Sequence, residues 1–442
     1  MAIVGGVDRV HSMAPRSKVV AWALWDCGST GLNAVVATFV FSVYLTGTVG
    51  QGISGSTSPA SMLGRALTVA GFLVALLAPL TGVLVQAPHR RRVVLATLTG
   101  LAAFFTAAMS LIGDDPSYLV PGLALLALTA ACGDLASVPY NAMLRGLSTP
   151  QNSGRISGFG WAAGYSGSVF LLLLVYFGFI SGEGPDRGLL GLPIEDGHNV
   201  RAAMLLAAAW LLIFGLPLIL ISKTTTAVRP ETSPGFFGGY RRLWDDLRGE
   251  WQRDRNLVYY LVVSAVFRDG LAGIFAFGAV LGVSVYGISQ ADVLIFGVFA
   301  STVAAIGAVA GGRLDDRVGA KPVIVVSLSA LIVVGMTLMA LSGPTAFWVC
   351  GLLLCLFVGP TQSAARTLLL RMTGEGKEGI AFGLYTTTGR AAAFLAPWLF
   401  FVFVDFFGSD RAGLAGICLV LAAGLVGMLL VRVPDHVRAT NS

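Results

Sequence analysis

The chain of 442 residues is 55% hydrophobic and only 12% charged, with a mean hydropathy of +0.80. Soluble domains carry about 25% charged residues, so a water-soluble fold would lack the polar surface that covers apolar side chains. The formal net charge is +6, but the basic residues fall in short connections between apolar blocks, a pattern of membrane topology. The composition therefore predicts an integral protein of the lipid bilayer with no nucleic-acid partner.

Apolar blocks recur along the chain at lengths near the ~20 residues that a helix needs to cross a bilayer. Membrane β-strands would alternate polar and apolar residues; these blocks do not, so each predicts a helix. The block from Val19 is too long for a signal-peptide core and is expected to remain as the first span. The expected spans are residues 19–45, 60–85, 93–113, 117–144, 156–181, 199–222, 256–286, 291–312, 322–343, 345–371, 379–405 and 411–431.

The connections between these spans differ in charge. Most of the 29 lysines and arginines lie in every second connection or at the two chain ends. The positive-inside rule then places both termini in the cytoplasm, which requires an even number of spans, and twelve satisfies it. We expect a multi-pass monomer in the inner or plasma membrane.

The longest polar stretch divides the chain into halves. Its apolar residues recur at helical spacing, which predicts an amphipathic helix resting on the lipid interface, with a regulatory partner site as the alternative. Those residues are Tyr240, Leu243, Trp244, Leu247 and Trp251. The expected organisation is a cytoplasmic segment at 1–18, a six-helix bundle at 19–222, a cytoplasmic linker at 223–255, a second six-helix bundle at 256–432 and a cytoplasmic tail at 433–442.

The two halves repeat one another, which is a transporter signature. An aspartate early in the first span of each half precedes a tyrosine near its end, and a proline in the fourth span precedes an arginine six residues later. The matching residues are Asp26 and Tyr44 with Asp269 and Tyr286, and Pro139 and Arg145 with Pro360 and Arg366. The pattern predicts an all-α membrane protein of twelve helices in two pseudo-symmetric bundles.

Charges inside the spans are costly, so they are candidates for a functional site facing the interior. They are Asp26, Asp134, Arg268, Asp269, Arg366 and Arg390. The spans hold no histidine and no mid-span glutamate, so the three aspartates are the candidate proton carriers. A helix cap or a static ion pair is the alternative for Asp26 and Asp269. Arg366 is expected either to anchor a substrate carboxylate or to pair with Asp134.

Aromatic and amide side chains are expected to line the central cavity with these charges, although ordinary helix packing is the alternative for the aromatic ones. They are Trp22, Trp25, Trp161, Tyr165, Tyr385, Asn33, Asn141 and Gln362. The five cysteines fall in apolar blocks without metal-ligand spacing, so they predict no metal site. There is no nucleotide-binding loop and no nucleophile–base pair, which argues against an enzyme and a cofactor and for transport driven by a gradient. A receptor would need a large ligand-binding domain and a channel a ring of like charges in the pore, and the sequence shows neither.

The connection between the eighth and ninth spans, Gly312 to Lys321, matches G-x-L-x-D-R-x-G-x-K/R at every signature position and resembles the major facilitator superfamily. Further stretches resemble its vacuole-effluxer-like branch, which contains fungal autophagy-related vacuolar amino-acid effluxers and bacterial relatives. They are Ala21–Asp26, Tyr140–Ala142, Gly154–Trp161, Asp269–Gly270, Phe275–Gly278, Gln362, Arg366 and Phe382–Tyr385. The resemblance implies alternating access for a small polar solute, with amino-acid export as the leading expectation and sugars, drugs or lipid-like compounds as the alternative.

The same resemblance implies a gating latch at the cytoplasmic surface. Asp316 would join the halves through Arg317, Arg371 or the start of the fifth span near Arg155, where helix amides favour a negative charge. The other signature positions of this latch are Gly312, Gly319 and Lys321. The matching connection of the first half has Gln86 in place of the aspartate, so the latch is expected to be one-sided. A solvated surface loop is the alternative.

Overall fold

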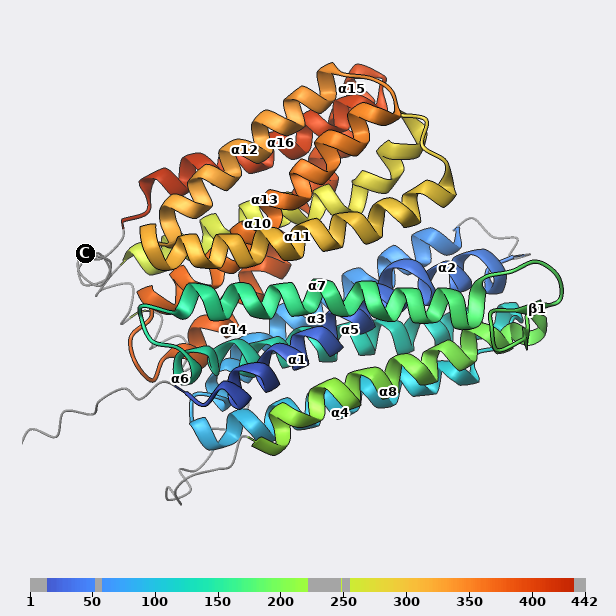
Figure 1. The fold of residues 1–442 in the computed structure, drawn as a ribbon, viewed down its shortest axis with the longest axis horizontal. Coiled ribbons are helices and arrows are strands. Elements are labelled where there is room, and N and C mark those ends of the chain that lie inside the picture. The colour runs from blue at the N-terminus through green and yellow to red at the C-terminus, as the bar shows by residue number, and fades with distance from the viewer. Residues whose placement is uncertain (1–13, 52–57, 222–247, 249–254, 433–442) are drawn as a thin grey trace, which may run out of the picture.

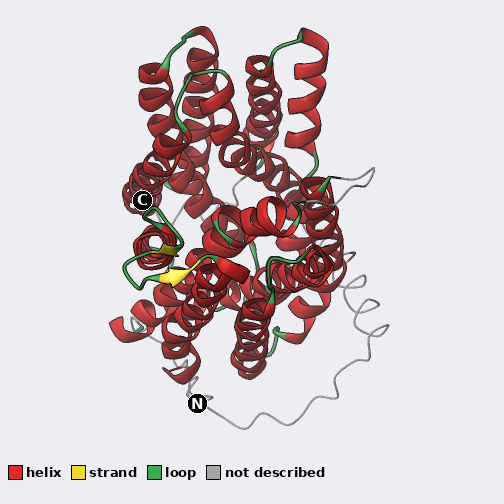
Figure 2. Cartoon of the chain, turned by 90° about the vertical axis from the view of Figure 1, so that its right-hand side faces the viewer, coloured by secondary structure: helices red, strands yellow, loops and turns green. Residues whose placement is uncertain are grey.

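The computed structural model describes residues 14–51, 58–221, 248 and 255–432. The expected linker helix, apart from Arg248, lies outside the described residues. Twelve helical segments in this part of the chain are long and apolar enough to cross a membrane. Figure 2 shows that helix makes up nearly all of the fold, with one short strand pair at the face turned to the viewer.

The first half contains α1 (Arg16–Asn33), η1 (Ala34–Phe39), α2 (Phe41–Tyr44), η2 (Leu45–Val49), α3 (Pro59–Leu84), α4 (Pro88–Ala108), η3 (Met109–Leu111), η4 (Pro116–Tyr118), α5 (Leu119–Ala142), α6 (Leu144–Leu147), α7 (Ser153–Val175), η5 (Tyr176–Ile180), β1 (Asp186–Arg187), β2 (Leu192–Pro193), η6 (Glu195–Gly197) and α8 (His198–Ile221). The strands pair antiparallel, with Asp186 opposite Pro193. The second half contains α10 (Arg255–Ser284), α11 (Gln290–Val318), α12 (Ala320–Ala340), α13 (Pro344–Met372), α14 (Glu378–Ala392), α15 (Leu395–Phe407) and α16 (Asp410–Leu430).

The two halves form two bundles, with the blue-to-green helices mostly below and the yellow-to-red helices mostly above in Figure 1, while α14 of the second half lies lower, against α3. Because the spans alternate in direction, α1 begins and α16 ends at one face of the molecule, which we call the terminal face. The opposite face, where β1 and β2 lie, is the far face (Figure 1).

The sequence repeat corresponds to a repeated contact. The Tyr44 hydroxyl donates to the carbonyl of Ile112, just past the third span, at 3.4 Å. The Tyr286 hydroxyl donates to the carbonyl of Leu338, at the end of the ninth span, at 2.7 Å. Each tyrosine therefore joins the first and third spans of its own half, as pseudo-symmetry requires.

Several spans have boundaries that the apolar pattern did not predict, and two of them bear on the site. Helix α11 continues to Val318, six residues past the expected end of the eighth span, and stops at Gly319, whose φ is 91°. Glycine adopts this left-handed geometry without a steric penalty, so Gly319 ends the helix where polarity alone could not. Most of the signature connection is therefore helix rather than loop. The eleventh span breaks between α14 and α15, at Ala393 and Phe394.

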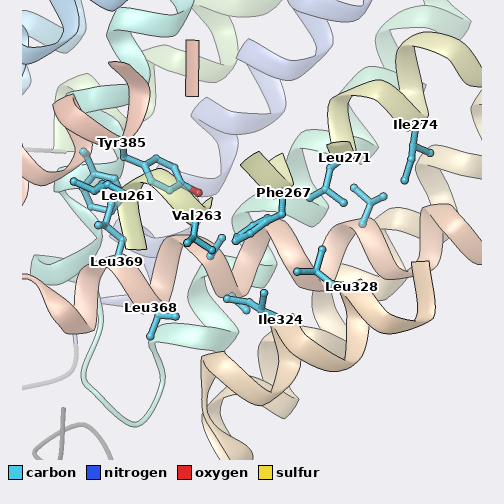
Figure 3. Packing of buried hydrophobic residues seen from close by; sticks show 14 of the residues in the cluster. Leu261, Val263, Phe267, Leu271, Ile274, Ile324, Leu328, Leu368, Leu369 and Tyr385 are labelled. Carbon is cyan, nitrogen blue, oxygen red and sulfur yellow. The ribbon is translucent and has the colours of Figure 1, made fainter. Parts of the chain in front are cut away.

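Apolar side chains from α10 form the centre of the second bundle. Phe267 is fully buried. A Cβ on Gly424 of α16 would lie 2.5 Å from the Cβ of Phe267, and Figure 3 shows the Phe267 ring near Val263, Ile324 and Leu328. Inside a bilayer such contacts stabilise the fold through close packing, because lipid tails are as apolar as the side chains. This packing fixes the rotation of α10 about its axis, so the next two residues, Arg268 and Asp269, face away from this apolar centre and line the cavity described below.

Glycine pairs bring the two halves into backbone contact near the terminal face. A Cβ on Gly312 of α11 would lie 2.4 Å from the carbonyl oxygen of Gly154 in α7. A Cβ on Gly82 of α3 would lie 2.5 Å from the carbonyl oxygen of Gly379 in α14. Small residues permit such close approach, so these two crossings hold the halves together at that end.

Candidate functional site

A cavity of ≈ 710 Å³ lies between the two halves and is lined by residues of both. Its lining extends from Asp26 and Arg366 to Phe39, Leu281 and Phe347, which lie close to the far ends of their helices. This volume falls in the range of about 300–1,000 Å³ that small-molecule sites occupy. The cavity is therefore the candidate site for a small solute.

Arg366 and Asp26 form the floor of the cavity. Arg366 is 4% exposed, and its Nη2 lies 3.6 Å from Asp26 Oδ2, at the long end of ion-pair distances. The carboxylate also accepts hydrogen bonds from Tyr140 at 3.1 Å and Thr30 at 3.4 Å. The predicted pairing of Arg366 with Asp134 is wrong, because Arg366 pairs with Asp26 and Asp134 pairs with Arg390.

Aromatic rings surround the Arg366 guanidinium. Its carbon lies 5.0 Å from the ring centroid of Trp161, 5.2 Å from Trp22 and 5.6 Å from Tyr140. Trp22 stacks on Tyr140 with a centroid distance of 4.5 Å and donates from Nε1 to the Tyr140 carbonyl at 3.0 Å. These contacts fix the guanidinium by cation–π attraction without using its hydrogen-bond donors.

Four residues that line the cavity each have a buried polar side-chain atom without a hydrogen-bond partner. The atoms are Nη1 of Arg366, Nε1 of Trp161, Oδ1 of Asn141 and the hydroxyl of Thr129. Buried polar groups are nearly always paired, and leaving one unpaired costs about 1–3 kcal/mol. Donors and acceptors without partners beside a cavity match a ligand that carries both an anionic acceptor and a donor.

A second ion pair crosses the cavity. Arg390 of α14 contacts the carboxylate of Asp134 in α5, so it joins the two halves. Arg268 of α10 stacks on the Tyr385 ring, 3.6 Å from its centroid, and its Nη1 donates to the Tyr385 carbonyl at 3.0 Å. The sequence predicted that the charged residues lie in the site, but it offered Arg366 as the partner of Asp134 and no partner for Arg268 or Arg390, because the sequence does not show which helices meet.

Asp269 caps the break in the eleventh span. It is 6% exposed, lines the cavity and accepts a hydrogen bond from the backbone N–H of Ala396 at 2.6 Å. That N–H lies in the first turn of α15, where helix amides favour a negative charge. Within the described residues, Asp269 has no cationic side chain at ion-pair distance.

The remaining expected lining residues differ in role. Tyr165, Gln362 and the exposed Asn33 line the cavity. Trp25 also reaches it, but its Nε1 donates to Thr99 Oγ1 at 3.0 Å and its ring stacks on Tyr140. Helix packing therefore accounts for most contacts of Trp25. Trp22 is fully buried behind the floor and does not line the cavity.

Asp316 joins the halves at the terminal face. Its carboxylate accepts hydrogen bonds from the backbone N–H groups of Gly154 and Arg155, at 2.7 and 3.1 Å, and from Arg155 Nε at 2.8 Å. Arg371 Nη2 lies 3.8 Å away. We call these residues the Asp316 cluster. The carboxylate thus lies at the start of α7, and the solvated-loop alternative does not describe it.

Other signature residues lie outside this cluster. Lys321 donates to the carbonyls of Leu429 and Val431, at 2.9 and 2.7 Å, and so secures the end of α16. The expected contact of Arg317 with Asp316 is wrong, because Arg317 faces solvent. The preceding residue, Asp315, is fully buried and bonds Arg371 and Thr367, each at 2.5 Å. Sequence reasoning missed Asp315.

The expectation of a one-sided latch is wrong. Glu378 at the start of α14 is 3% exposed and contacts Arg91 Nη2 at 3.0 Å and Arg145 Nε at 2.6 Å, both in the first half. Arg145 also donates to the carbonyls of Leu370 and Thr373. These residues form the Glu378 cluster. The carboxylate missing at Gln86 is thus supplied from the opposite half of the molecule.

The two clusters and the glycine pairs close the terminal face. Ser157 adds a hydrogen bond across the halves, to the Ser363 carbonyl at 3.0 Å. Along the described chain, the polar contacts that join the halves lie between the Asp134–Arg390 pair and the terminal face. The cavity therefore extends toward the far face and is sealed on the other side.

Comparison with known families gives one match over nearly the whole chain. The family model described as "Vacuole effluxer Atg22 like" matches residues 26–440. The chain is similar to an uncharacterised MFS-type transporter, YxiO, of Bacillus subtilis, with 21% identity over 417 residues, 94% of each chain. It is also similar to autophagy-related protein 22 of Yarrowia lipolytica, with 23% identity in an alignment 286 positions long that covers 57% of this chain and 46% of that protein.

Solved structures share the fold at low sequence identity. The proton:xylose symporter XylE aligns with a TM-score of 0.70 and 14% identity, over 94% of each chain. The transporter FucP in its outward conformation aligns with a TM-score of 0.67 and 15% identity, over 94% of this chain and 100% of that one. A bacterial homologue of the iron transporter ferroportin aligns at 0.64 and 16%, over 94% and 97%. These structures support the major facilitator fold and say nothing of the solute.

Proposed function

Because the chain belongs to the Atg22-like vacuole effluxer family, within the major facilitator superfamily of transporters, we propose that it carries amino acids across its membrane by alternating access. The solute binds in the central cavity, and the two six-helix halves rock to expose it to one face and then the other. The family description favours export as the direction. The distribution of basic residues favours an inner or plasma membrane, with the terminal face cytoplasmic.

The observation that carries this proposal is the buried Arg366 guanidinium with its free Nη1. A buried arginine fork recognises a carboxylate in two-point geometry, which a lysine could not reproduce. Trp161 Nε1 supplies a further donor, and Asn141 Oδ1 is the acceptor for an ammonium group. A carboxylate and an ammonium on neighbouring carbons are the defining groups of an α-amino acid.

Without substrate, Asp26 is the carboxylate that pairs with Arg366. Its contact with Arg366 is long, at 3.6 Å, while Tyr140 and Thr30 hold it from the other side. A substrate carboxylate that bonds Arg366 directly would replace this weak pair by a stronger one. The exchange keeps the buried guanidinium neutralised at every stage, which a membrane interior demands.

We propose proton coupling at Asp269. Asp26 and Asp134 each have an arginine partner, whereas Asp269 has only the Ala396 N–H as a described polar partner. Its position beside the break between α14 and α15 links its charge to a helix end in the cavity wall. Protonation would weaken that cap and so favour movement of the eleventh span.

The test is uptake and efflux of labelled amino acids by the purified protein in proteoliposomes, with and without a pH gradient. Saturable flux of one amino-acid class, stimulated by the gradient, is the expected result. Arg366→Gln should abolish it. A sugar and a cationic drug serve as the competing solutes. Flux of either one, with none for any amino acid, would overturn the substrate assignment and leave the fold as it is.

A further inference from the structure

We infer that Arg268 forms a second anion site in the cavity, which receives the substrate carboxylate before Arg366 does while the cavity is open to the far face. This inference rests on the proposed transport of a carboxylate-bearing solute. It adds a loading step and a residue that governs it. The evidence is the fixed position of Arg268, its unmatched charge and its greater access from the cavity.

The Arg268 guanidinium is held in place but not neutralised. It stacks on the Tyr385 ring and donates one hydrogen bond to the Tyr385 carbonyl at 3.0 Å. The backbone of Gly389, one turn further along α14, is also close, since an added Cβ there would lie 2.5 Å from Arg268 Nη2. A planar cation held against one face of a helix is organised in advance to bind a planar anion.

The carboxylates near Arg268 are engaged elsewhere. Asp269, the next residue, points to the Ala396 N–H. Asp134, across the cavity, is paired with Arg390. Over the described part of the chain, no carboxylate lies within ion-pair distance of Arg268. Its positive charge in the wall of the cavity is therefore available to an anion that enters.

Arg268 and Arg366 differ in how far an incoming anion must travel to reach them. The Tyr260 hydroxyl donates to the carbonyl of Ala365 at 2.7 Å, so α10 passes the level of Arg366 near Tyr260. Arg268 lies two turns further along α10 toward the far face, which corresponds to about 12 Å. An anion entering from the far face thus meets Arg268 first.

Access also differs between the two arginines. Arg268 is half-buried in the cavity wall, whereas Arg366 is 4% exposed and its Nη1 is enclosed. The free donor of Arg366 becomes reachable only when the residues of the cavity floor move. Loading at Arg268 followed by transfer to Arg366 gives a role to the arginine of the cavity wall that has no carboxylate at ion-pair distance among the described residues.

Chemical labelling tests the order of access without relying on transport. Phenylglyoxal, which modifies accessible arginines, is applied to the intact purified protein, and peptide mass spectrometry gives the rate at each arginine. We expect Arg268 to react at least about tenfold faster than Arg366. Sodium propionate should slow the reaction at Arg268, while the uncharged propionamide should not. Equal rates at the two arginines, or equal protection by both compounds, would overturn the inference.

Two variants test the role in loading. Arg268→Gln should raise KM about tenfold or more, the loss expected for a hydrogen bond to a charged group, with little change in kcat. Gly389→Ala displaces the guanidinium but keeps its charge, and it should raise KM in the same direction even if Arg268→Gln fails to fold. Gly71→Ala is the matched control, since its Cβ would meet only Arg390 Cδ at an ordinary 3.9 Å.

The outcomes separate this inference from the proposed function. Amino-acid transport with an unchanged KM in both Arg268→Gln and Gly389→Ala would refute the loading site and leave the transporter assignment standing. Propionate protection of Arg268 in a protein that carries no amino acid would support the anion site and refute the proposed substrate.

Discussion

Arg366 and Asp26 depend on one another because both are buried. Replacing Arg366 with Gln should abolish amino-acid flux and also destabilise the protein. It removes the cation that pairs with the Asp26 carboxylate in the described part of the chain, a loss of about 3–5 kcal/mol. Arg366→Lys keeps the charge but not the two-point fork, so its flux should fall by about tenfold or more. Flux is measured in proteoliposomes and stability by thermal unfolding in detergent.

The double variant Asp26→Asn/Arg366→Gln separates the structural role from the transport role. Removing both charges should restore most of the lost stability without restoring flux. Wild-type flux in the double variant would mean that the pair is only a static contact between α1 and α13.

Asp269→Asn tests the proposed proton carrier. The amide oxygen can still accept the hydrogen bond from Ala396, so the variant should fold and should resemble the protonated state, with its weaker cap on α15. We expect amino-acid accumulation driven by a pH gradient to fall to the level without a gradient, while exchange of labelled for unlabelled amino acid continues. Asp405→Asn, at an exposed carboxylate of the same span, is the control. Unchanged gradient-driven accumulation would remove Asp269 from the mechanism.

The sequence predicted which charged residues belong to the cavity better than it predicted which residues they contact. The cost of intramembrane charge singled out the six residues of the cavity, and all six line it. Their pairing could not be predicted, because it depends on how each helix is rotated and which span of the other half it meets. Asp134 therefore pairs with Arg390 rather than with Arg366.

Among the elements, α7 and α14 each begin at a carboxylate contact between the halves. Asp316→Asn and Glu378→Gln should each favour opening of the terminal face, and Glu378→Gln more so, because it leaves Arg91 and Arg145 without their shared partner. The measurement is alkylation, from the terminal side, of a cysteine introduced at Gln362 in a background without native cysteines. Faster alkylation is expected for both variants.

Arg155→Gln provides a graded comparison for this experiment. It removes one side-chain bond to Asp316 but leaves the two backbone N–H donors of α7 in place. Its effect on alkylation should be smaller than that of Asp316→Asn. If all three variants label at the parent rate, neither cluster controls the terminal face.

Glu378 shows why an element boundary could hide a functional residue. It lies in the polar segment before the eleventh span, where a solvated glutamate is the ordinary expectation. Its burial results from the close crossing of α3 and α14 at Gly82 and Gly379. The sequence shows that Gln86 stands where the family has an aspartate. It does not show that Glu378, far along the chain, supplies the carboxylate instead, because that contact forms only in the folded structure.

For the whole molecule, the number of spans and the division into halves could be predicted, because both depend on patterns that are visible in the sequence. Bilayer thickness sets the length of apolar blocks, and gene-duplicated halves keep matched residues such as Tyr44 and Tyr286. The closed terminal face was not predictable in this way. It depends on contacts between the halves, each of which combines residues more than a hundred positions apart.

Backbone contact between the halves gives a prediction for the rocking motion itself. A methyl group at Gly312 would lie 2.4 Å from the Gly154 carbonyl oxygen, so Gly312→Ala should wedge α11 away from α7 at the terminal face. Gly100→Ala, where nothing lies within 4 Å of the added Cβ, is the control. We expect Gly312→Ala to increase alkylation at Gln362→Cys from the terminal side and to decrease it from the far side. A decrease from both sides would indicate a collapsed cavity instead, and equal labelling to the Gly100→Ala control would show that this crossing does not limit the opening of the halves.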